Sequence, residues 1–505
     1  MSNQKKILFW LNGFLLHYVL SYYLQSQINA EFYGIIDVNS HNKKFFINQD
    51  FVKYKKIWFY HDQIKKDYNY NLDFLNSIEK KYDLTLWQYA INERYFYNYN
   101  RFYKFSKNQI LSILEQEIKL FENILDEIKP DFFLTYDPVL HHQKLLLDIC
   151  KKRKIKILSI ITATGLNDKT LIVEDGENYD INHDINHDVN HHINSDHVPN
   201  KNHTESIGDK YGDKVARYVE QRNTSNVNKI KAISQLILDR NYEDVNSNYM
   251  YYGRTKLKVI KDSINLELNK RNNLKFLIKH SEKLPNFKKP YLYFPLSVDE
   301  EMNILHYAPF YTNQITLIEN IAKSLPINYQ LYVKEHIAAS TRGWHNPDFY
   351  QKILKIPNVV LINPFTNHEN LIKNSKLVLT IRGSSSLTAL KNKIPVILFG
   401  KYPIQVVPSV FSPTSLTELP DLIHKAISHV VEDDFNTYYN ILYERLFDFS
   451  FFDYEIRRNK YFFVGEINSN VDIKQSTMKK FLDENKKSFN NLVDEHIKII
   501  KKNSL

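Results

Sequence analysis

Over residues 1–165, short apolar runs alternate with longer segments in which apolar residues recur at helical spacing. The short runs KILFWL, FYGIIDV, KIWFYH, FFLTY and IKILSII predict strands. The longest helical pattern is KNQILSILEQEIKLFENILDEI, and one face of it carries Ile110, Ile113, Leu114, Ile118, Phe121 and Leu125. Strands that alternate with helices predict parallel α/β layering.

The same alternation returns from residue 289 onward. Strands are expected near residues 291–294 and in YQLYVKEH, NVVLI, KLVLTI and PVILFG. Helices are expected over residues 312–325, 348–354, 368–374 and 385–391. The sequence therefore predicts two parallel-sheet domains, 1–167 and 289–430, followed by a helical C-terminal segment, 431–505. Ligands of such folds sit in a cleft at the carboxyl ends of the strands.

The stretch between these two domains differs in composition. Residues 168–205 contain the repeat INHD INHD VNHH INSD, which has too few apolar residues to compensate for the entropy of ordering. Its histidines and aspartates could chelate a metal. Because the repeat lacks a fixed helical pair of ligands, we expect a disordered insertion and no metal site. Residues 206–288 predict a polar, basic and helical connector.

Residues 7–24, ILFWLNGFLLHYVLSYYL, carry no charge and follow two lysines. The run could be a signal anchor or a buried strand, turn and helix. Asn12, Gly13 and His17 interrupt it, and SYYLQSQINA is a poor cleavage region, so we favour the buried alternative.

Length and composition are typical of a soluble globular protein of several domains. The chain has 505 residues, of which 43% are hydrophobic and 25% charged. Cys150 is the single cysteine, which excludes a disulfide framework and a cysteine-based zinc site. It lies in the helical pattern LLLDICKK, so we expect a buried, unreactive thiol and a cytoplasmic protein.

The net charge is +10, and the basic excess is concentrated in two segments, 254–289 and 474–502. Such segments are either solvated helix faces or an attraction for an anionic partner, such as a membrane surface or a lipid-phosphate acceptor. Neither a zinc-finger spacing nor an RNA-recognition signature is present, so we expect no nucleic-acid partner. Membrane attraction would place the protein peripherally at the inner face of the cell membrane.

Distinctive polar clusters follow three predicted strands of the second domain. Lys334 and His336 end the first, Arg382 and Gly383 end the second, and Gly400 and Tyr402 follow the third. The chain has only 11 glycines, so a glycine at a strand end is informative. A glycine turn before a helix lets backbone N–H groups approach a phosphate, and arginine matches phosphate geometry. Ser384 and Ser385 add hydroxyl donors, unless they only cap the helix.

A resemblance to capsule polysaccharide biosynthesis proteins, the Kdo-transferase-like group of GT-B glycosyltransferases, rests on several motifs. They are YFPLSVDEEMNILHYAPFYTNQ, YVKEH, RGW…FY, IPNVVLINP, LIKNSKLVLTIRGSSSLTAL and IPVILFG, within residues 290–412. The resemblance implies a GT-B-like α/β fold with two Rossmann-like domains facing a cleft. It also implies transfer of a sugar from a nucleotide-activated donor to a surface polysaccharide or lipid-linked glycan, without a metal or other cofactor.

The resemblance leads to two sets of candidate site residues. For donor and phosphate binding we expect Lys334, His336, Arg382, Gly383, Ser384, Ser385, Gly400 and Tyr402. For acid–base chemistry or sugar contact the candidates are Asp137, His17, His141 and Glu301, of which the first three could also be core or capping residues.

Two positions depart from the pattern of the resembled family. Ile337 stands where a proline usually follows the strand-end histidine, and Thr388 stands where a glutamate usually contacts the donor. The departures leave two alternatives open: a nucleotide-sugar epimerase of the same fold, or a catalytically degenerate scaffold for glycan assembly.

Overall fold

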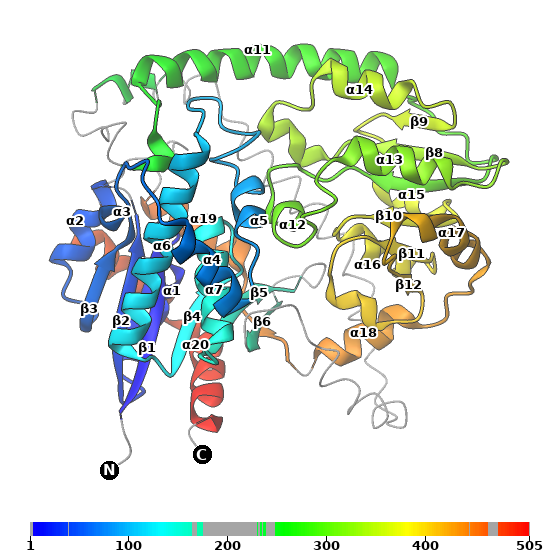
Figure 1. Ribbon diagram of the computed structural model, residues 1–505. Coiled ribbons are helices and arrows are strands. Elements are labelled where there is room, and N and C mark those ends of the chain that lie inside the picture. Colours follow the sequence, from blue (N-terminus) through cyan, green and yellow to red (C-terminus); the bar gives the residue numbers. More distant parts are fainter. Residues whose placement is uncertain are drawn as a thin grey trace.

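The computed structural model describes residues 4–38, 40–163, 169–174, 248–443, 445–462 and 473–503, with a few positions between 230 and 238. Two α/β domains lie side by side, and the long helix α11 (Lys256–His280) runs across the top of both (Figure 1). Each domain is built on one sheet with helices on both faces. The predicted GT-B-like fold class is confirmed.

The N-terminal sheet has seven strands in the order β13-β6-β5-β4-β1-β2-β3. Strands β1 to β5 are parallel, whereas β6 and β13 are antiparallel to their neighbours. The strands are β1 (Lys5–Asn12), β2 (Ala30–Asp37), β3 (Tyr54–Phe59), β4 (Phe132–Tyr136), β5 (Lys156–Thr162), β6 (Lys169–Glu174) and β13 (Phe447–Asp448). Their helices are α1 (Leu16–Leu24), α2 (Ser40–Asn48), α3 (Tyr60–Gln63), α4 (Leu72–Tyr82), α5 (Leu86–Ile91), α6 (Lys107–Ile128) and α7 (His141–Lys152).

The uncharged run 7–24 forms β1 and α1, and both are buried in the N-terminal core. The buried alternative predicted for this run is therefore confirmed. Among the described residues, no helix is both long and apolar enough to span a membrane. The Cys150 thiol is buried, as expected, and burial raises its pKa.

The C-terminal sheet has six parallel strands in the order β12-β11-β10-β7-β8-β9. They are β7 (Tyr291–Pro295), β8 (Gln330–Lys334), β9 (Val359–Ile362), β10 (Leu377–Thr380), β11 (Val396–Leu398) and β12 (Val410–Phe411). The accompanying helices are α12 (Met302–Leu305), α13 (Gln314–Lys323), α14 (Pro347–Leu354), α15 (His368–Lys373), α16 (Ser385–Lys391), α17 (Leu419–Ser428) and α18 (Asp434–Tyr443).

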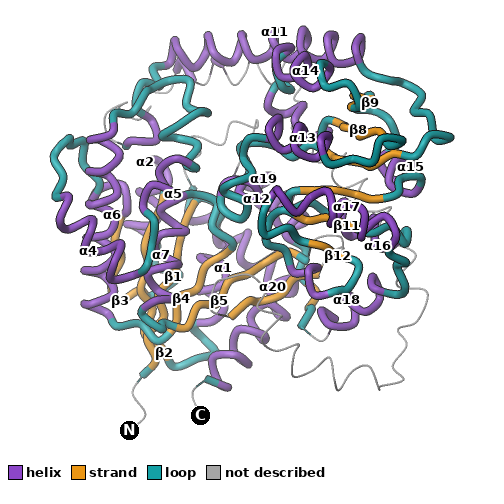
Figure 2. Tube along the Cα trace, turned by 45° about the vertical axis from the view of Figure 1, so that its right-hand side comes forward, coloured by secondary structure: helices purple, strands orange, loops and turns teal. Residues whose placement is uncertain are grey.

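The C-terminal segment returns to the first domain. Helices α19 (Phe451–Phe462) and α20 (Gln475–Lys502) pack into the N-terminal core, and α20 lies against α1. As a result, β1 begins and α20 ends at the same end of this domain (Figure 2). The prediction of a purely helical segment beyond residue 430 is wrong at β13, because this short strand extends the N-terminal sheet.

The insertion predicted over residues 168–205 also needs a correction. Residues 169–174 form β6, which pairs antiparallel with β5 and buries Leu171 and Val173. The rest of that range lies outside the described residues, as does most of the connector before residue 248. The later part of the connector is the helix α11, as predicted.

Candidate functional site

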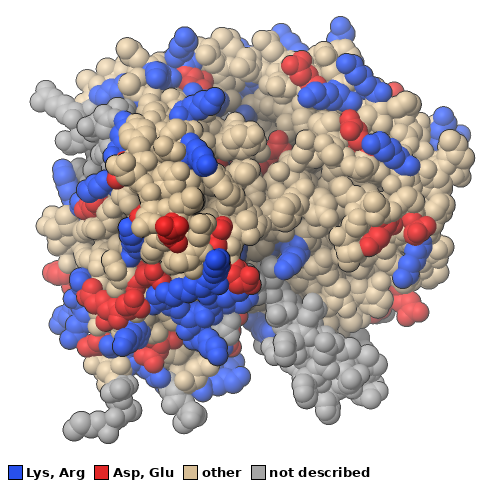
Figure 3. Space-filling model, in the orientation of Figure 1, with Lys and Arg blue, Asp and Glu red and all other residues tan. Residues whose placement is uncertain are grey.

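A cavity of about 1010 Å³ opens between the two domains. The molecular surface is hollowed where the domains meet (Figure 3). The carboxyl ends of strands from both sheets line the cavity, which we call the cleft. Of the residues predicted from the sequence, the cleft brings together Asp137, Glu301, His336, Arg382, Gly383, Ser384, Ser385 and Tyr402.

Gly383 lies in the turn from β10 to α16, where space is short. A Cβ added to Gly383 would lie 2.9 Å from Thr380 Oγ1 and 3.1 Å from Ser385 Oγ, so a larger residue would displace two hydroxyls that border the cleft. The capping alternative is not supported, because Ser384 makes no side-chain cap bond. Among the described residues, no hydrogen-bond partner is found for the hydroxyls of Ser384 and Ser385. Both are available to a ligand.

Arg382 is held rigidly beside this turn. Its side chain is 6% exposed, and its guanidinium stacks over Tyr307 with 3.8 Å between the Cζ atom and the ring centroid. The Nε atom donates to the Lys401 carbonyl at 3.0 Å, and Nη1 donates to Asn303 Oδ1 at 2.5 Å. A guanidinium fixed in this way is pre-organised for an anion, because its remaining donors lose little entropy on binding.

Basic residues gather near the end of β8. His336 borders the cleft, and its Nδ1 accepts a hydrogen bond from the Ala338 N–H at 3.2 Å, so its proton is on Nε2. Lys334 is buried beside the cleft and does not line it; burial lowers its pKa to about 8. Burial, reinforced by the charges of Lys334 and His336, lowers the pKa of His368 to about 3.

His368 also lines the cleft and was not among the site residues predicted from the sequence. Its position at the start of α15, after the strand NVVLI, is the same strand-end pattern that identified the other candidates. Thr388, in contrast, does not line the cleft; its hydroxyl donates to the Ser384 carbonyl at 3.4 Å.

The role predicted for Gly400, contact with the donor, needs a correction. It does not line the cleft, and its N–H donates to the Ile381 carbonyl at 2.7 Å. A Cβ there would lie 2.9 Å from that carbonyl oxygen and 3.0 Å from the Cβ of Ala308. The glycine is therefore required for close packing of the chain behind Arg382, and donor contact is not its role.

Asp137 borders the cleft from the N-terminal domain. Its carboxylate accepts a hydrogen bond from the Tyr307 hydroxyl of the C-terminal domain. Burial raises the pKa of Asp137 to about 6, and the positive charges of Arg382 and Lys144 oppose this rise. Glu301 lines the cleft at the start of α12, where its side chain makes no cap bond.

The acid–base role predicted for His17 and His141 of the N-terminal domain also needs a correction, because neither residue lines the cleft. His17 is buried against Tyr136 with 5.6 Å between ring centroids, and burial lowers its pKa to about 3. His141 is also fully buried, with Nδ1 2.7 Å from Glu93 and Nε2 3.1 Å from Glu117. Burial alone would lower the pKa of His141, but Glu117 and Glu93 outweigh it and raise the pKa to about 10.

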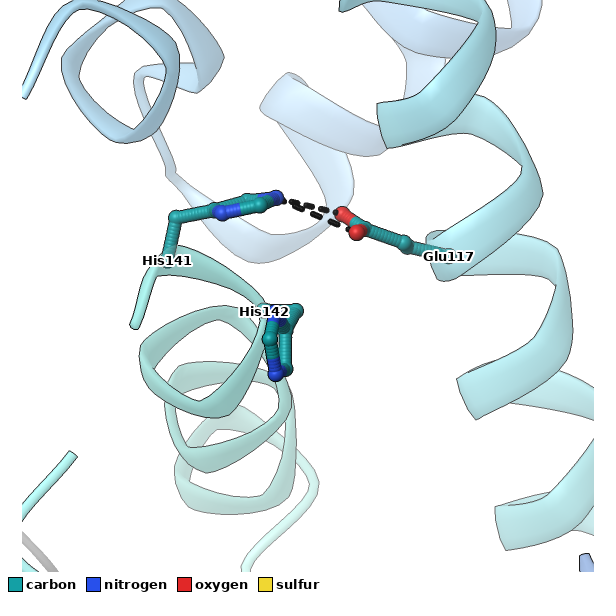
Figure 4. Close-up of side chains that lie close together, drawn as sticks. All are labelled: Glu117, His141 and His142. Atoms are coloured by element: carbon teal, nitrogen blue, oxygen red, sulfur yellow. Dashed lines mark hydrogen bonds and ion pairs between the residues drawn. The ribbon is translucent and has the colours of Figure 1, made fainter. Parts of the chain in front are cut away.

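A group with metal-ligating side chains lies around His141. Among the described residues, Glu117, His141 and His142 offer ligand atoms within 4.8 Å of one another (Figure 4). Both nitrogens of His141 face carboxylates, however, and a protonated imidazole has no lone pair for a metal. The group is a satisfied ion network, and we assign no metal ligand in it.

A pair of cleft residues in the N-terminal domain, Asp37 and His61, was not predicted from the sequence. Asp37 is the last residue of β2, and His61 follows β3 closely. His61 Nε2 lies 2.8 Å from Asp37 Oδ1, and His142 Nε2 lies 3.3 Å from Asp37 Oδ2. The signal was present: FYGIID and KIWFYH end in polar residues, like the strands of the second domain.

Residues 217–406 match the family model of capsule polysaccharide biosynthesis proteins. The match includes β7 to β11 with Lys334, His336, Arg382 and Gly383, so the resemblance predicted from the sequence is confirmed over this part of the chain. No curated protein sequence matches the chain significantly.

Solved structures with a similar arrangement have low identity and low TM-scores. One is Staphylococcus aureus MnaA with UDP, at 14% identity and TM-score 0.25, covering 90% of this chain and 95% of that one. Another is the beta Kdo 2,7 transferase KpsC of Thermosulfurimonas dismutans, at 12% identity and TM-score 0.28, covering 70% and 86%. A third is a UDP-GlcNAc 2-epimerase of Methanocaldococcus jannaschii, at 13% identity and TM-score 0.26; the match covers 87% of this chain and 99% of that one. At these TM-scores the similarities carry no argument about function.

Proposed function

We propose that this protein is a glycosyltransferase that moves a sugar from a nucleotide-activated donor to a capsular or other surface polysaccharide, or to a lipid-linked glycan. The observation that carries the proposal is the rigid Arg382 guanidinium beside the hydroxyls of Ser384 and Ser385, at a strand end that lines the cleft. The match of this region to capsule polysaccharide biosynthesis proteins supports the assignment.

The donor phosphate would bind at the turn after β10. Arg382 supplies charge-assisted donors, the two serines supply hydroxyls, and Gly383 allows the backbone to come close. The protonated Nε2 of His336 adds a further donor from the end of β8. Together these groups would stabilise negative charge as the nucleotide leaves. Such electrostatic stabilisation is usually the largest contribution to the rate enhancement of an enzyme. The mechanism therefore needs no metal.

The sugar and its acceptor would occupy the part of the cleft between the two sheets. Asp137 and Glu301 border this space from opposite domains and are the carboxylates proposed to contact the sugars. A basic surface would favour an acceptor that carries phosphate or lies at an anionic membrane.

A panel of UDP-, GDP-, CMP- and dTDP-linked sugars tests the proposal, first by thermal shift. A donor at 100 times its Kd stabilises the fold by about 2.7 kcal/mol. Arg382→Ala should reduce this shift, whereas Arg342→Ala, which removes an exposed arginine outside the cleft, should leave it unchanged. Product analysis with glycan fragments follows. A transferred sugar supports the proposal, an epimerised nucleotide sugar would identify an epimerase, and binding without turnover would indicate a scaffold.

A further inference from the structure

A second cavity, of about 620 Å³, lies between the two domains, and we name it the second pocket. Its N-terminal wall is formed by α5, by α7 and by the turn between α4 and α5, and its C-terminal wall by the segment that follows α12. Two interdomain bonds divide it from the cleft: Tyr307 donates to Asp137, and His306 Nε2 donates to the Val139 carbonyl at 3.1 Å. Asp137 and Val139 line the cleft, whereas His306 and Tyr307 line the second pocket.

The charged side chains that line the second pocket are mostly basic. They are Lys144, Lys151 and Lys152 of α7, Lys401 of the C-terminal domain, and the aspartates Asp83 and Asp148. Lys152 is 3.2 Å from Asp83, whose side chain is 94% exposed, and an ion pair with so solvated a partner contributes little. Lys401 is exposed, and within the described part of the chain no ion pair is found for its side chain. Figure 3 shows basic side chains gathered over α7, next to the hollow where the domains meet.

The spacing of these lysines indicates how the negative charge of a ligand would be distributed. Lys144 and Lys151 are seven residues apart on α7, so they stand about 10 Å apart along the helix axis. Lys401 stands on the opposite wall. Cations separated in this way fit charges that are spread along a chain better than they fit one phosphate group.

Aromatic side chains border the same cavity. Phe310 lines it and is 87% exposed, and it takes no part in the C-terminal core, against which its neighbour Tyr311 packs. Tyr89 of α5 lines the N-terminal wall. The face of an aromatic ring carries partial negative charge, so it attracts the polarised C–H groups of a sugar ring, whereas lysines attract carboxylates and phosphates. Both kinds of side chain in one cavity match a ligand that is at once a carbohydrate and an anion.

The second pocket lies directly behind the proposed phosphate site. The Lys401 carbonyl accepts the hydrogen bond from Arg382 Nε at 3.0 Å, and the next residue, Tyr402, lines the cleft. Because the two interdomain bonds stand between the cavities, a ligand in the second pocket does not touch the reacting atoms. It would bind close to the cleft and leave the cleft open.

We propose that the second pocket binds a segment of an acidic glycan, a polysaccharide whose sugars carry carboxylate or phosphate groups, at a distance from its reacting end. This inference rests on the proposed function, because the glycan is the acceptor chain. Binding in the second pocket holds that chain on the enzyme and raises the effective concentration of its free end at the cleft. Long acidic acceptors therefore bind more tightly than short ones.

The first test measures binding to the full chain by calorimetry. The probes are an oligogalacturonate, with a carboxylate on each sugar, and a phosphomannan oligosaccharide; a neutral dextran oligomer and inorganic polyphosphate are the controls. We expect at least one acidic oligosaccharide to bind more tightly than both controls, and the two probes distinguish carboxylate from phosphate as the recognised group. A parent protein that binds neither acidic probe, or binds polyphosphate or dextran equally well, would overturn the inference.

The second test replaces two exposed side chains of the second pocket. Phe310→Ala combined with Lys401→Ser should weaken binding of the acidic oligosaccharide by about 10-fold and leave the melting temperature unchanged. Phe365→Ala combined with Lys355→Ser, which are exposed and line neither cavity, is the matched control. Equal binding by the pocket variant and the parent would overturn the inference. Loss of UDP binding in the pocket variant would overturn it as well, and would identify a nucleotide site.

Transfer assays separate this inference from the proposed function. At saturating donor, the pocket variant should raise KM for a long acidic acceptor and leave kcat, donor binding and the KM of a short acceptor at the values of the parent. A rise in KM that is equal for long and short acceptors would overturn the proposed role. If the parent transfers no sugar, the proposed function fails, whereas the calorimetric result still decides whether the second pocket binds acidic glycans.

Discussion

Tyr307 connects the two sides of the cleft: its ring lies 3.8 Å below the Arg382 guanidinium, and its hydroxyl donates to Asp137 of the opposite domain. A second interdomain bond, from His306 Nε2 to the Val139 carbonyl at 3.1 Å, lies next to it. The proposed phosphate site and the N-terminal wall of the cleft are therefore joined through one aromatic side chain. Movement of one domain relative to the other would therefore change the position of the Arg382 side chain.

The carboxyl of Asp137 makes the stability of this interdomain contact depend on pH. Its folded-state pKa of about 6 lies above the usual 3.8, so its contribution to stability is present at low pH and is lost as the pH rises through 6. Asp137→Asn should remove this loss and stabilise the protein at pH 8 by on the order of 2–3 kcal/mol. At pH 4 the two proteins should have similar free energies of unfolding.

Urea unfolding at both pH values measures this effect. Tyr307→Phe, which keeps the ring over Arg382 and removes the hydroxyl, is the matched control and should retain donor binding. Equal destabilisation of Asp137→Asn at both pH values would contradict the proposed role of the buried charge.

The two strand-end glycines should respond differently to the same substitution. At Gly383 a new Cβ meets the hydroxyls of Thr380 and Ser385, which can rotate, so Gly383→Ala should weaken donor binding with a small change in melting temperature. At Gly400 a new Cβ meets the Ile381 carbonyl oxygen and the Cβ of Ala308, and neither atom can rotate away. Gly400→Ala should therefore destabilise the fold by about 1–3 kcal/mol.

Calorimetric titration with a donor and thermal melting separate these two outcomes. Arg382→Ala belongs to the same series and should weaken donor binding by about 1.5–3 kcal/mol, the range for a hydrogen bond to a charged group. If Gly383→Ala unfolds the protein while donor binding by Arg382→Ala equals that of the parent, the phosphate site is misplaced.

Most of the fold was predictable because its elements have strong local patterns. The strands β1, β4, β5 and β7 to β11 are continuous apolar runs, typical of parallel strands buried on both faces, and each was located from the sequence. The helix α6 was equally clear, with a capping box at Ser106 and an apolar face. The strand β13 was missed because its antiparallel pairing with β6, far away in sequence, leaves no local signal. The strand β6 follows its partner β5 closely and was missed because the predicted insertion was taken to begin at residue 168.

The site was predictable on one sheet and less so on the other. In the C-terminal domain, strand ends with glycine, serine and arginine pointed to Arg382 and Ser385, and both line the cleft. Gly400 shows that a strand-end glycine can also serve packing alone. In the N-terminal domain, His141 was chosen and His61 missed. The sequence does not reveal that Glu93 and Glu117 enclose His141, because these carboxylates lie on other elements.

The His141 network should control stability at alkaline pH. The pKa of His141 is raised from 6.5 to about 10, so its contribution is complete below pH 6.5 and is lost as the pH rises toward 10. His141→Ala would leave Glu93 and Glu117 buried without their cation and should cost about 3–5 kcal/mol at pH 7. Urea unfolding at pH 7 and pH 9.5 measures both effects, with His424→Ala, on the exposed face of α17, as the control. Destabilisation by EDTA of the parent protein, but not of His141→Ala, would indicate a metal at this network instead.

The outer face of α11 is the surface that we propose to meet an anionic membrane. It exposes Leu257 (80%), Ile264 (51%) and Leu268 (54%) among lysines and arginines, so apolar contact and basic charge are available on the same helix. Each basic residue near such a surface contributes about 1 kcal/mol at low salt.

Co-sedimentation with vesicles that contain phosphatidylserine tests this surface. We expect binding that weakens as salt rises, and that is lost when Leu257, Ile264 and Leu268 are all replaced by serine, because the apolar contact then disappears while the charge is kept. Replacing Leu284 and Ile327, which are exposed outside α11, by serine is the matched control and should leave binding intact. Binding that persists in the α11 variant, or that does not depend on salt, would show that this face is not the contact.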